Sequence, residues 1–198
     1  MKKKIVCIAG TSRPNNYTSR ALAIVVDELE KRSAMTVALD ARRMTLGFPD
    51  EPATQDATRL RLEVEQASAV VLATPEYHGS FSAMTKLIIE NLGFPSVLSG
   101  KPVALLGVAA GRIGAIKALE QLRGVCAHTG AIVLPGAISI AGVRGAFNAE
   151  GAPTDPGTEK ALRGLATSLL EFIKNYVCPK YALEAMVRGD TPPWSSSV

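Results

Sequence analysis

A chain of 198 residues, 47% of them hydrophobic and 20% charged, is long enough to bury the core of one globular domain. Its formal net charge of +4 is too small to indicate a nucleic-acid-binding protein, but it suits small anionic ligands such as nucleotides. The three cysteines, Cys7, Cys126 and Cys178, lie far apart without a Cys-x-x-Cys pair, which argues against a disulfide framework and a zinc site.

The N-terminus, "MKKKIVCIAG", carries the positive charges of a secretory signal, but its apolar run covers only residues 5–9. No stretch of the sequence approaches the roughly 20 apolar residues that span a bilayer. We therefore expect a cytoplasmic protein whose first strand is buried.

Short apolar runs without polar alternation predict the buried strands of a parallel sheet. They are residues 5–9, 35–39, 69–73, 103–108 and 131–134. Segments with helical spacing of apolar residues lie between them, and a last amphipathic helix follows "TDPG". The alternation predicts a doubly wound α/β sandwich, in which ligands bind at the carboxyl ends of the strands.

Two polar segments lie outside this pattern. Residues 42–58 form a polar connection with two prolines, which we expect to be a surface loop. The predicted domain covers residues 1–176, and residues 177–198 form a tail that is either flexible or docks on a partner subunit through Trp194.

The loop after the first strand, "GTSRPNNYTSR", gathers hydroxyl and amide side chains around Arg13 before a helix. A helix N-terminus offers unpaired N–H groups and a positive partial charge, so this loop predicts a phosphate site. Thr18 and Ser19 are also good N-cap residues, and one of them could serve the helix instead. Neither standard nucleotide fingerprint, G-x-G-x-x-G or G-x-x-x-x-G-K-[ST], follows the strand.

The same segment contains a Cys-x5-Arg spacing, from Cys7 to Arg13, which is typical of phosphatases that attack a phosphate with a thiolate. In that alternative Asp155, in "TDPG", acts as the general acid. The position of Cys7 inside an apolar run favours a buried structural thiol, whose pKa rises instead of falling.

The loop after the third strand contains "TPEYHGSFS". We expect Pro75 to end the strand, Tyr77 and His78 to offer flat rings, and Gly79 to let the backbone approach a ligand. Such a loop suits a planar heterocycle, although Tyr77 could be ordinary rim packing and Glu76 a solvated charge. After the fourth strand, "GVAAGRIGAIK" allows a tight turn at Gly111 and adds the charge of Arg112.

Two segments together resemble a known family. "AGTSRPNNYTSRALA" and "ATPEYHGSFSAMTKLI" look like the two flavin-contacting blocks of the NADPH-dependent FMN reductases. The second block is especially similar to the "SFSGALK" form in FMN reductases of sulfonate utilisation. The resemblance covers roughly residues 1–175. It implies a flavodoxin-like fold with a five-stranded parallel sheet in the order 2-1-3-4-5.

The resemblance also implies a set of cofactor-binding residues. The FMN phosphate would bind Ser12, Arg13, Thr18 and Ser19, with Tyr17 nearby and Thr11 in place of the commoner serine. Pro75, Glu76, Tyr77, His78, Gly79 and Ser80 would frame the isoalloxazine and ribityl groups. Gly111 and Arg112 would lie beside the flavin pyrimidine ring, unless Arg112 meets the NADPH phosphate. The chain departs from the family where "AMTK" replaces "GALK", which puts Ala83 at the usual glycine.

An NAD(P)H-dependent FMN reductase, which passes a hydride from NADPH or NADH to FMN, is the first functional hypothesis. Positioning alone can drive this reaction, so we expect no catalytic side chain and no metal. Reduced FMN would supply a partner monooxygenase, or bound FMN would reduce a quinone, azo dye or metal oxyanion. A flavodoxin-type electron carrier is a third class, disfavoured by the pI of about 9.0. The resemblance further implies a homodimer or homotetramer.

Overall fold

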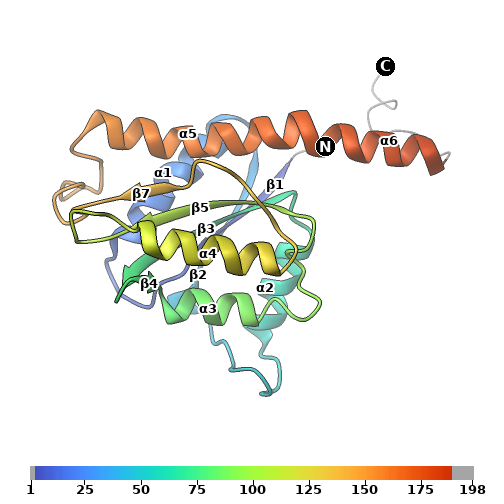
Figure 1. Cartoon of the computed structure of the whole chain (residues 1–198), viewed down its shortest axis with the longest axis horizontal. Helices are drawn as coiled ribbons and strands as arrows, with labels where there is room; N and C mark the ends of the chain where they lie inside the picture. The colour runs from blue at the N-terminus through green and yellow to red at the C-terminus, as the bar shows by residue number, and fades with distance from the viewer. Residues whose placement is uncertain (1–2, 189–198) are drawn as a thin grey trace.

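A parallel sheet with helices on both faces forms the body of the chain (Figure 1). The structure is a computed structural model that describes residues 3–188. Its parallel strands pair in the order β2-β1-β3-β5-β6. They are β1 (Lys4–Ala9), β2 (Met35–Asp40), β3 (Ala69–Tyr77), β5 (Pro102–Val108) and β6 (Ile132–Val133). Strands β5 and β6 are the fourth and fifth of the strands predicted from the sequence. With this correspondence, the predicted order 2-1-3-4-5 is confirmed.

The predicted count of five strands is wrong, because the sheet contains seven. The two-residue strand β4 (Ser80–Phe81) pairs antiparallel with the end of β3, and β7 (Ile138–Ile140) pairs parallel with β5. Strands β6 and β7 use different parts of β5, since Val133 is opposite Val103 and Ile138 is opposite Leu106. Two short strands thus share the last position in the sheet, where the sequence indicated one.

Strand β3 does not end at Pro75, contrary to the prediction. It continues to Tyr77, and Pro75 lies opposite Val108 of β5. Pairing of β1 with β3 stops at Ala73. Pro75 has no N–H group, but no hydrogen bond to β1 is lost because the pairing has already ended. The extra length carries β3 past the edge of β1 and into the candidate site.

Helices α1 (Tyr17–Lys31) and α5 (Pro156–Phe172) cover one face of the sheet (Figure 1). Helices α2 (Gln55–Glu65), α3 (Ala83–Glu90) and α4 (Ile116–His128) cover the other. Side chains of β1 alternate between the two cores, with Cys7 facing α1 and α5 and Val6 and Ile8 facing the opposite helices. This double burial explains why the strands read as continuous apolar runs.

The polar segment of residues 42–58 is not a loop throughout, which corrects the prediction. A short 3₁₀ turn, η1 (Ala41–Arg43), covers its first two residues, and α2 begins within it at Gln55. Thr54 caps α2, because its side chain accepts a hydrogen bond of 3.0 Å from the Ala57 N–H. Few residues of α2 are buried, namely Ala57, Leu60 and Val64, so its helical periodicity is weak in the sequence.

Helix α5 continues through a π-helical turn, η2 (Ile173–Val177), into α6 (Cys178–Arg188), which extends beyond the sheet (Figure 1). The predicted boundary after residue 176 thus falls within a helical segment. The helical spacing of apolar residues that ends at Tyr176 predicts this residue on the buried face of the last helix, but Tyr176 is 66% exposed. Trp194 lies outside the described residues, so its docking stays a prediction. None of the helices in residues 3–188 is both long and apolar enough to cross a bilayer.

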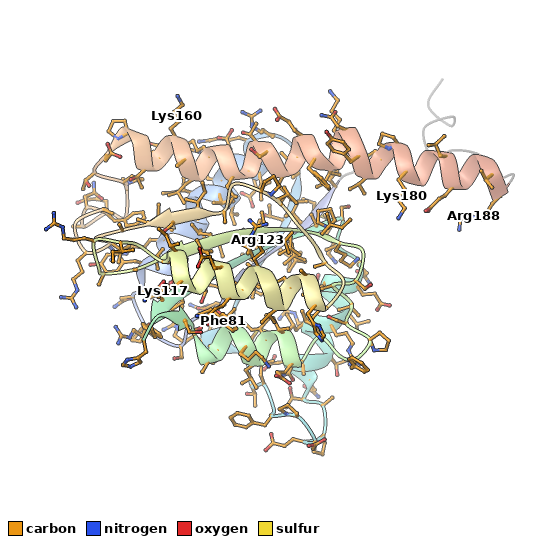
Figure 2. All side chains as sticks on the ribbon, viewed as in Figure 1. Phe81, Lys117, Arg123, Lys160, Lys180 and Arg188 are labelled. Atoms are coloured by element: carbon orange, nitrogen blue, oxygen red, sulfur yellow. The ribbon has the colours of Figure 1, made fainter. Side chains whose placement is uncertain are left out.

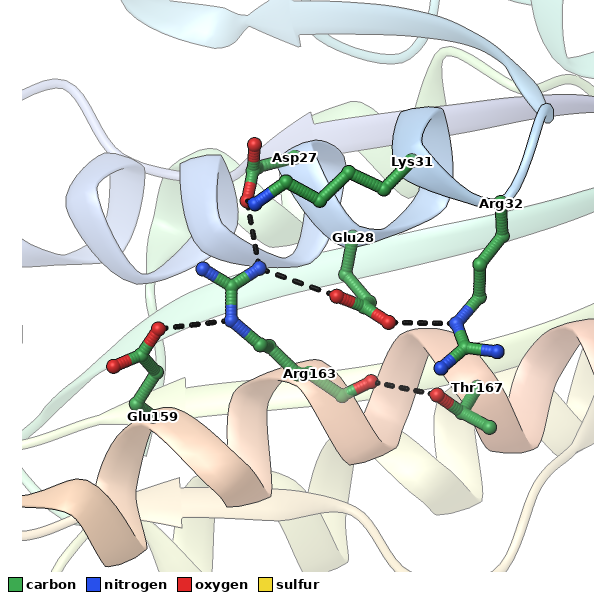
Figure 3. A network of polar contacts seen from close by, with 7 residues as sticks. All are labelled: Asp27, Glu28, Lys31, Arg32, Glu159, Arg163 and Thr167. Atoms are coloured by element: carbon green, nitrogen blue, oxygen red, sulfur yellow. Dashed lines mark hydrogen bonds and ion pairs between the residues drawn. The ribbon is translucent and has the colours of Figure 1, made fainter.

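An ionic network ties α5 to α1 (Figure 3). The Nη1 atom of Arg163 lies 2.6 Å from Oδ2 of Asp27 and 3.2 Å from Oε2 of Glu28. Lys31 also binds the Asp27 carboxylate, and Arg32 also binds that of Glu28. Hydrogen bonds from Lys31 first and Arg163 second lower the pKa of Asp27, while those from Arg32 and then Arg163 lower that of Glu28.

We expect Arg163→Met to lower the urea midpoint of unfolding at pH 7 and to have a smaller effect at pH 3. The folded-state pKa values of Asp27 and Glu28 lie below those of the unfolded chain. Their contribution is therefore present above about pH 4 and is lost as the pH falls through the folded-state values. As a control, Arg123→Met removes a hydrogen bond to the Leu134 carbonyl, which does not titrate. If Arg163→Met lowered the urea midpoint equally at both pH values, the ionic network would not be the source of the lost stability.

Candidate functional site

The candidate site lies where three loops leave the same edge of the sheet. These are the β1 loop (residues 10–16), the β3–β4 hairpin (residues 76–81) and the β5 loop (residues 109–115). Because β1, β3 and β5 are adjacent and parallel, their carboxyl ends meet, as doubly wound folds require. The structure thus brings together the three segments that the sequence analysis selected.

Asn16 shapes the β1 loop and begins α1. Its Oδ1 accepts a hydrogen bond of 2.7 Å from the Ser19 N–H, and its Nδ2 donates to the Arg13 carbonyl oxygen at 2.9 Å. Asn16 is therefore the N-cap, and the prediction that Thr18 or Ser19 caps the helix is wrong. The hydroxyl of Ser19 is buried and has no hydrogen-bond partner among residues 3–188, and Thr18 is only 1% exposed.

The exposed end of the β1 loop faces the hairpin. Ser12 and Arg13 are exposed, and the Cζ atom of Arg13 lies 5.1 Å from the centre of the Tyr77 ring. The Arg13 N–H donates to Oγ1 of Thr11, whose side chain is buried. A guanidinium group of the β1 loop thus lies over an aromatic ring of the hairpin.

Tyr17 turns toward a different part of the chain. Its ring stacks on Phe147 with centres 6.2 Å apart, and Arg20 lies over it with Cζ at 5.4 Å. Arg20 also donates to the carbonyl oxygen of Asn148. The segment after β7 therefore packs against the start of α1 and buries Val143 and Phe147.

The hairpin is a two-residue turn between β3 and β4. Tyr77 pairs with Ser80, and the two residues between them have positive φ angles, 51° for His78 and 73° for Gly79. Two consecutive positive φ values define a type I′ turn, which matches the twist of the flanking strands. Gly79 suits this geometry, while His78 is a less common residue for it and is held exposed at the tip.

Helix α4 holds the hairpin in place. Oε2 of Glu76 accepts a hydrogen bond of 3.0 Å from the Ala118 N–H, which satisfies a donor in the first turn of α4. Gln121 binds the turn twice, since its Nε2 donates to the Gly79 carbonyl oxygen at 2.9 Å and its Oε1 accepts from Ser80 Oγ at 2.7 Å. Glu76 is therefore not a solvated charge, and Ser80 is already engaged.

Two further side chains complete this contact. Phe81 packs against Ala109, Ala115 and Ala118, and Figure 2 shows it beside α4, with Lys117 at the start of that helix. A Cβ atom built on Gly79 would lie 3.5 Å from Cδ of Lys117, so this lysine reaches the turn. No pattern in the sequence indicates that Gln121 and Lys117 contact the hairpin, because only the fold places α4 against it.

The β5 loop is anchored from its base and exposed at its tip. The Gly111 carbonyl oxygen accepts hydrogen bonds from the N–H groups of Gly114 and Gly142, and Oγ of Ser139 accepts from the Ala115 N–H at 2.8 Å. Gly114 has a φ of 82°, and a Cβ there would lie 2.4 Å from Ser139 Oγ. Arg112, at the tip, is exposed.

The phosphatase alternative does not fit this geometry. Cys7 is fully buried, and burial first, with the charge of Glu30 second, raises the pKa of its thiol to about 12. Asp155 caps α5, and hydrogen bonds from Thr158 and Gly157 lower its pKa, the opposite of what a general acid needs. Cys7 is a structural residue of β1, and its spacing to Arg13 is coincidental.

The chain matches the sequence model of the NADPH-dependent FMN reductases over residues 3–144. It belongs to this family. The NAD(P)H-dependent FMN reductase of Pseudomonas aeruginosa is 33% identical over 129 residues, which cover 61% of this chain and 67% of that protein. The NADPH azoreductase of a Bacillus species is 30% identical over 140 residues, or 71% of this chain and 78% of that protein. A Burkholderia 2-hydroxy-1,4-benzoquinone reductase is 27% identical over 139 residues, or 68% of this chain and 75% of that protein.

Solved structures support the flavodoxin-like fold. The flavoenzyme NAD(P)H:(acceptor) oxidoreductase of Paracoccus denitrificans superposes with a TM-score of 0.73 at 24% identity, covering 88% of this chain and 98% of that one. A flavodoxin of Streptococcus pneumoniae gives a TM-score of 0.60 at 17% identity, covering 86% of this chain and 99% of that one. These likenesses show the fold, and the family match shows that the chain is an oxidoreductase that uses FMN and NAD(P)H.

We expect iodoacetamide at pH 8 to label Cys178 in the folded protein and to leave Cys7 and Cys126 unmodified. Cys178 is exposed, whereas burial raises the pKa of both other thiols to about 12. Peptide mass mapping after a timed reaction measures the labelling, and the same reaction in urea should label all three sites. Labelling of Cys7 as fast as Cys178 would reopen the phosphatase alternative.

Proposed function

We propose that the three loops bind FMN and that the protein reduces it with NAD(P)H. The observation that carries this proposal is the contact between the Arg13 guanidinium, in the loop that leads into α1, and the Tyr77 ring of the hairpin. FMN has a dianionic phosphate at one end and a planar ring at the other. The phosphate suits the Arg13 guanidinium, and the planar ring suits the Tyr77 side chain. The full proposed set comprises Thr11, Ser12, Arg13, Tyr17, Thr18, Ser19, Pro75, Glu76, Tyr77, His78, Gly79, Ser80, Gly111 and Arg112.

The phosphate is assigned to the β1 loop. Arg13 offers a cationic fork, Ser12 an exposed hydroxyl, and the first turn of α1 its N–H groups and positive partial charge. Asn16 takes only the Ser19 N–H, which leaves those of Tyr17 and Thr18 for an anion. Thr11 supports the site from below by accepting the Arg13 N–H.

The ring is assigned to the hairpin and the β5 loop. His78 is exposed at the tip of the hairpin beside Tyr77, Lys117 reaches the turn at Gly79, and Arg112 adds a positive charge at the exposed tip of the β5 loop. When bound, FMN supplies the hydride-accepting ring, so the protein needs only to bind, orient and exclude water. The contacts of Glu76 and Gln121 keep the hairpin rigid for that purpose.

FMN has two possible roles, as a substrate that dissociates after reduction or as a bound cofactor that passes electrons to a second acceptor. A dissociable FMN substrate that supplies a partner monooxygenase fits the FMN reductase name of the Pseudomonas relative. Tightly bound FMN that reduces azo compounds or quinones fits the names of the Bacillus and Burkholderia relatives. We favour FMN reduction as the basal activity, carried out by a cytoplasmic homodimer or homotetramer.

We expect the purified protein to oxidise NADPH, followed at 340 nm, only when FMN is added or retained. Ultrafiltration then separates the two candidates. Free flavin in the filtrate after reduction under anaerobic conditions supports FMN as a substrate, and retained flavin supports a bound cofactor. A protein that neither binds FMN nor oxidises NADPH in its presence would refute the proposed function.

We expect Arg13→Gln to weaken FMN binding roughly tenfold to a hundredfold, because a charge-assisted contact to the phosphate is lost. Riboflavin, which lacks the phosphate, should bind the variant and the wild type alike. Arg59→Gln, on the exposed face of α2, serves as the matched charge control. If Arg13→Gln weakened riboflavin as much as FMN, Arg13 would act through the ring and not through the phosphate.

A further inference from the structure

A buried cluster of hydroxyl groups joins the β1 loop to the base of the hairpin. Its members are Thr74 within β3, Ser82 before α3 and Thr85 in the first turn of α3, which are 0%, 4% and 0% exposed. The Oγ1 of Thr85 lies 3.0 Å from that of Thr74 and 2.9 Å from Oγ of Ser82. Three hydroxyls in a sealed space must satisfy one another or the backbone.

The cluster meets the backbone of the β1 loop at one atom, the carbonyl oxygen of Gly10. Ser82 Oγ donates to it, and Thr85 Oγ1 lies 3.1 Å from it in donor position. The Gly10 N–H in turn donates to the Ala73 carbonyl oxygen at 2.8 Å. The first residue of the β1 loop is therefore fixed to β3 and α3 through both its polar groups.

The contact is close enough to dictate a residue type. A Cβ atom at position 10 would lie 2.1 Å from Oγ1 of Thr85 and 3.0 Å from its Cβ. Only glycine can occupy this position while Thr85 keeps its place. The two residues thus form one interlocked contact, 75 positions apart in the chain.

The hydroxyl of Thr85 is not implied by the family resemblance. Where the related form reads "SFSGALK", this chain reads "SFSAMTK", so Thr85 stands at the leucine position. A leucine there would fill space but could not bind the Gly10 carbonyl. The polar link to Gly10 through this position therefore distinguishes this chain from the "SFSGALK" form.

We propose that Thr85 is a positioning residue that sets the separation between the phosphate-binding and ring-binding parts of the FMN site. It rests on the proposed function, which assigns the phosphate to the β1 loop and the ring to the hairpin. Thr85 touches neither part of the ligand. It holds the β1 loop at Gly10 to the helix that follows the hairpin, so the two ends of FMN meet loops already at the required spacing.

The test is Thr85→Val, which keeps the shape of the side chain and removes its hydroxyl. We expect the FMN dissociation constant and the KM for FMN to rise about tenfold, with kcat at saturating FMN changed less than about twofold. Thr85→Ser, which restores the hydroxyl, should return both constants to within about threefold of the wild type. This split and rescue distinguish positioning from a general loss of stability.

Thr129→Val is the matched control. Its hydroxyl donates to the Cys126 carbonyl oxygen at the end of α4, away from the three loops, at 2.8 Å. We expect this variant to lose stability without any change in FMN affinity. If Thr85→Val lost stability but bound FMN as tightly as the wild type, the proposal would be overturned.

Two further pairs of variants test the proposal if Thr85→Val fails to fold or binds FMN normally. If Thr85→Val does not fold, Thr85→Ala is compared with Thr85→Ser, and equal FMN affinities in that pair would overturn the proposal. The Arg13→Gln variant separates the two levels of inference. Weak binding by Arg13→Gln beside wild-type binding by Thr85→Val removes only the role of Thr85, whereas wild-type binding by both removes the assigned FMN site as well.

Discussion

Parallel pairing of β1, β3 and β5 is the constraint on which the rest of this structure depends. Parallel neighbours end at the same edge, so the loops after these strands meet although 60 or more residues separate the first from the second. The strands end unevenly, because β3 continues from Ala73 to Tyr77 after its pairing with β1 has stopped. That overhang becomes the first strand of the hairpin and projects it over the β1 loop.

Helix capping and site construction use the same residues. Asn16 caps α1 and fixes the Arg13 backbone, Glu76 satisfies the first turn of α4 from the hairpin, and Ser82 caps α3 while binding Gly10. Each unpaired N–H group at a helix start must find an acceptor. Where that acceptor comes from a neighbouring loop, the stability of the helix and the geometry of the site are coupled.

A site of this composition suits chemistry that needs positioning more than proton transfer. Its side chains supply cationic groups and hydroxyls, and its backbone supplies N–H donors. Within residues 3–188 no group of acidic, histidine or cysteine side chains is arranged to hold a metal ion. The fold alone does not select an activity, since flavodoxins and reductases share it. The family match, and not the fold, shows that the chain is an oxidoreductase.

The sequence by itself determined the alternation of strands and helices, the three loops and the family, because buried parallel strands and loop motifs leave local patterns in the chain. The strand order followed only from the family resemblance. It did not reveal α2, whose few buried residues make a weak pattern, or the split of the last strand position between β6 and β7. Only the tertiary structure decided that Asn16 is the cap, that Glu76 and Gln121 bind across the site, and that Thr85 meets Gly10. Apart from the Asn16 cap, which is local, these contacts join residues 42 or more positions apart, and a hydrogen bond between such residues has no local signal.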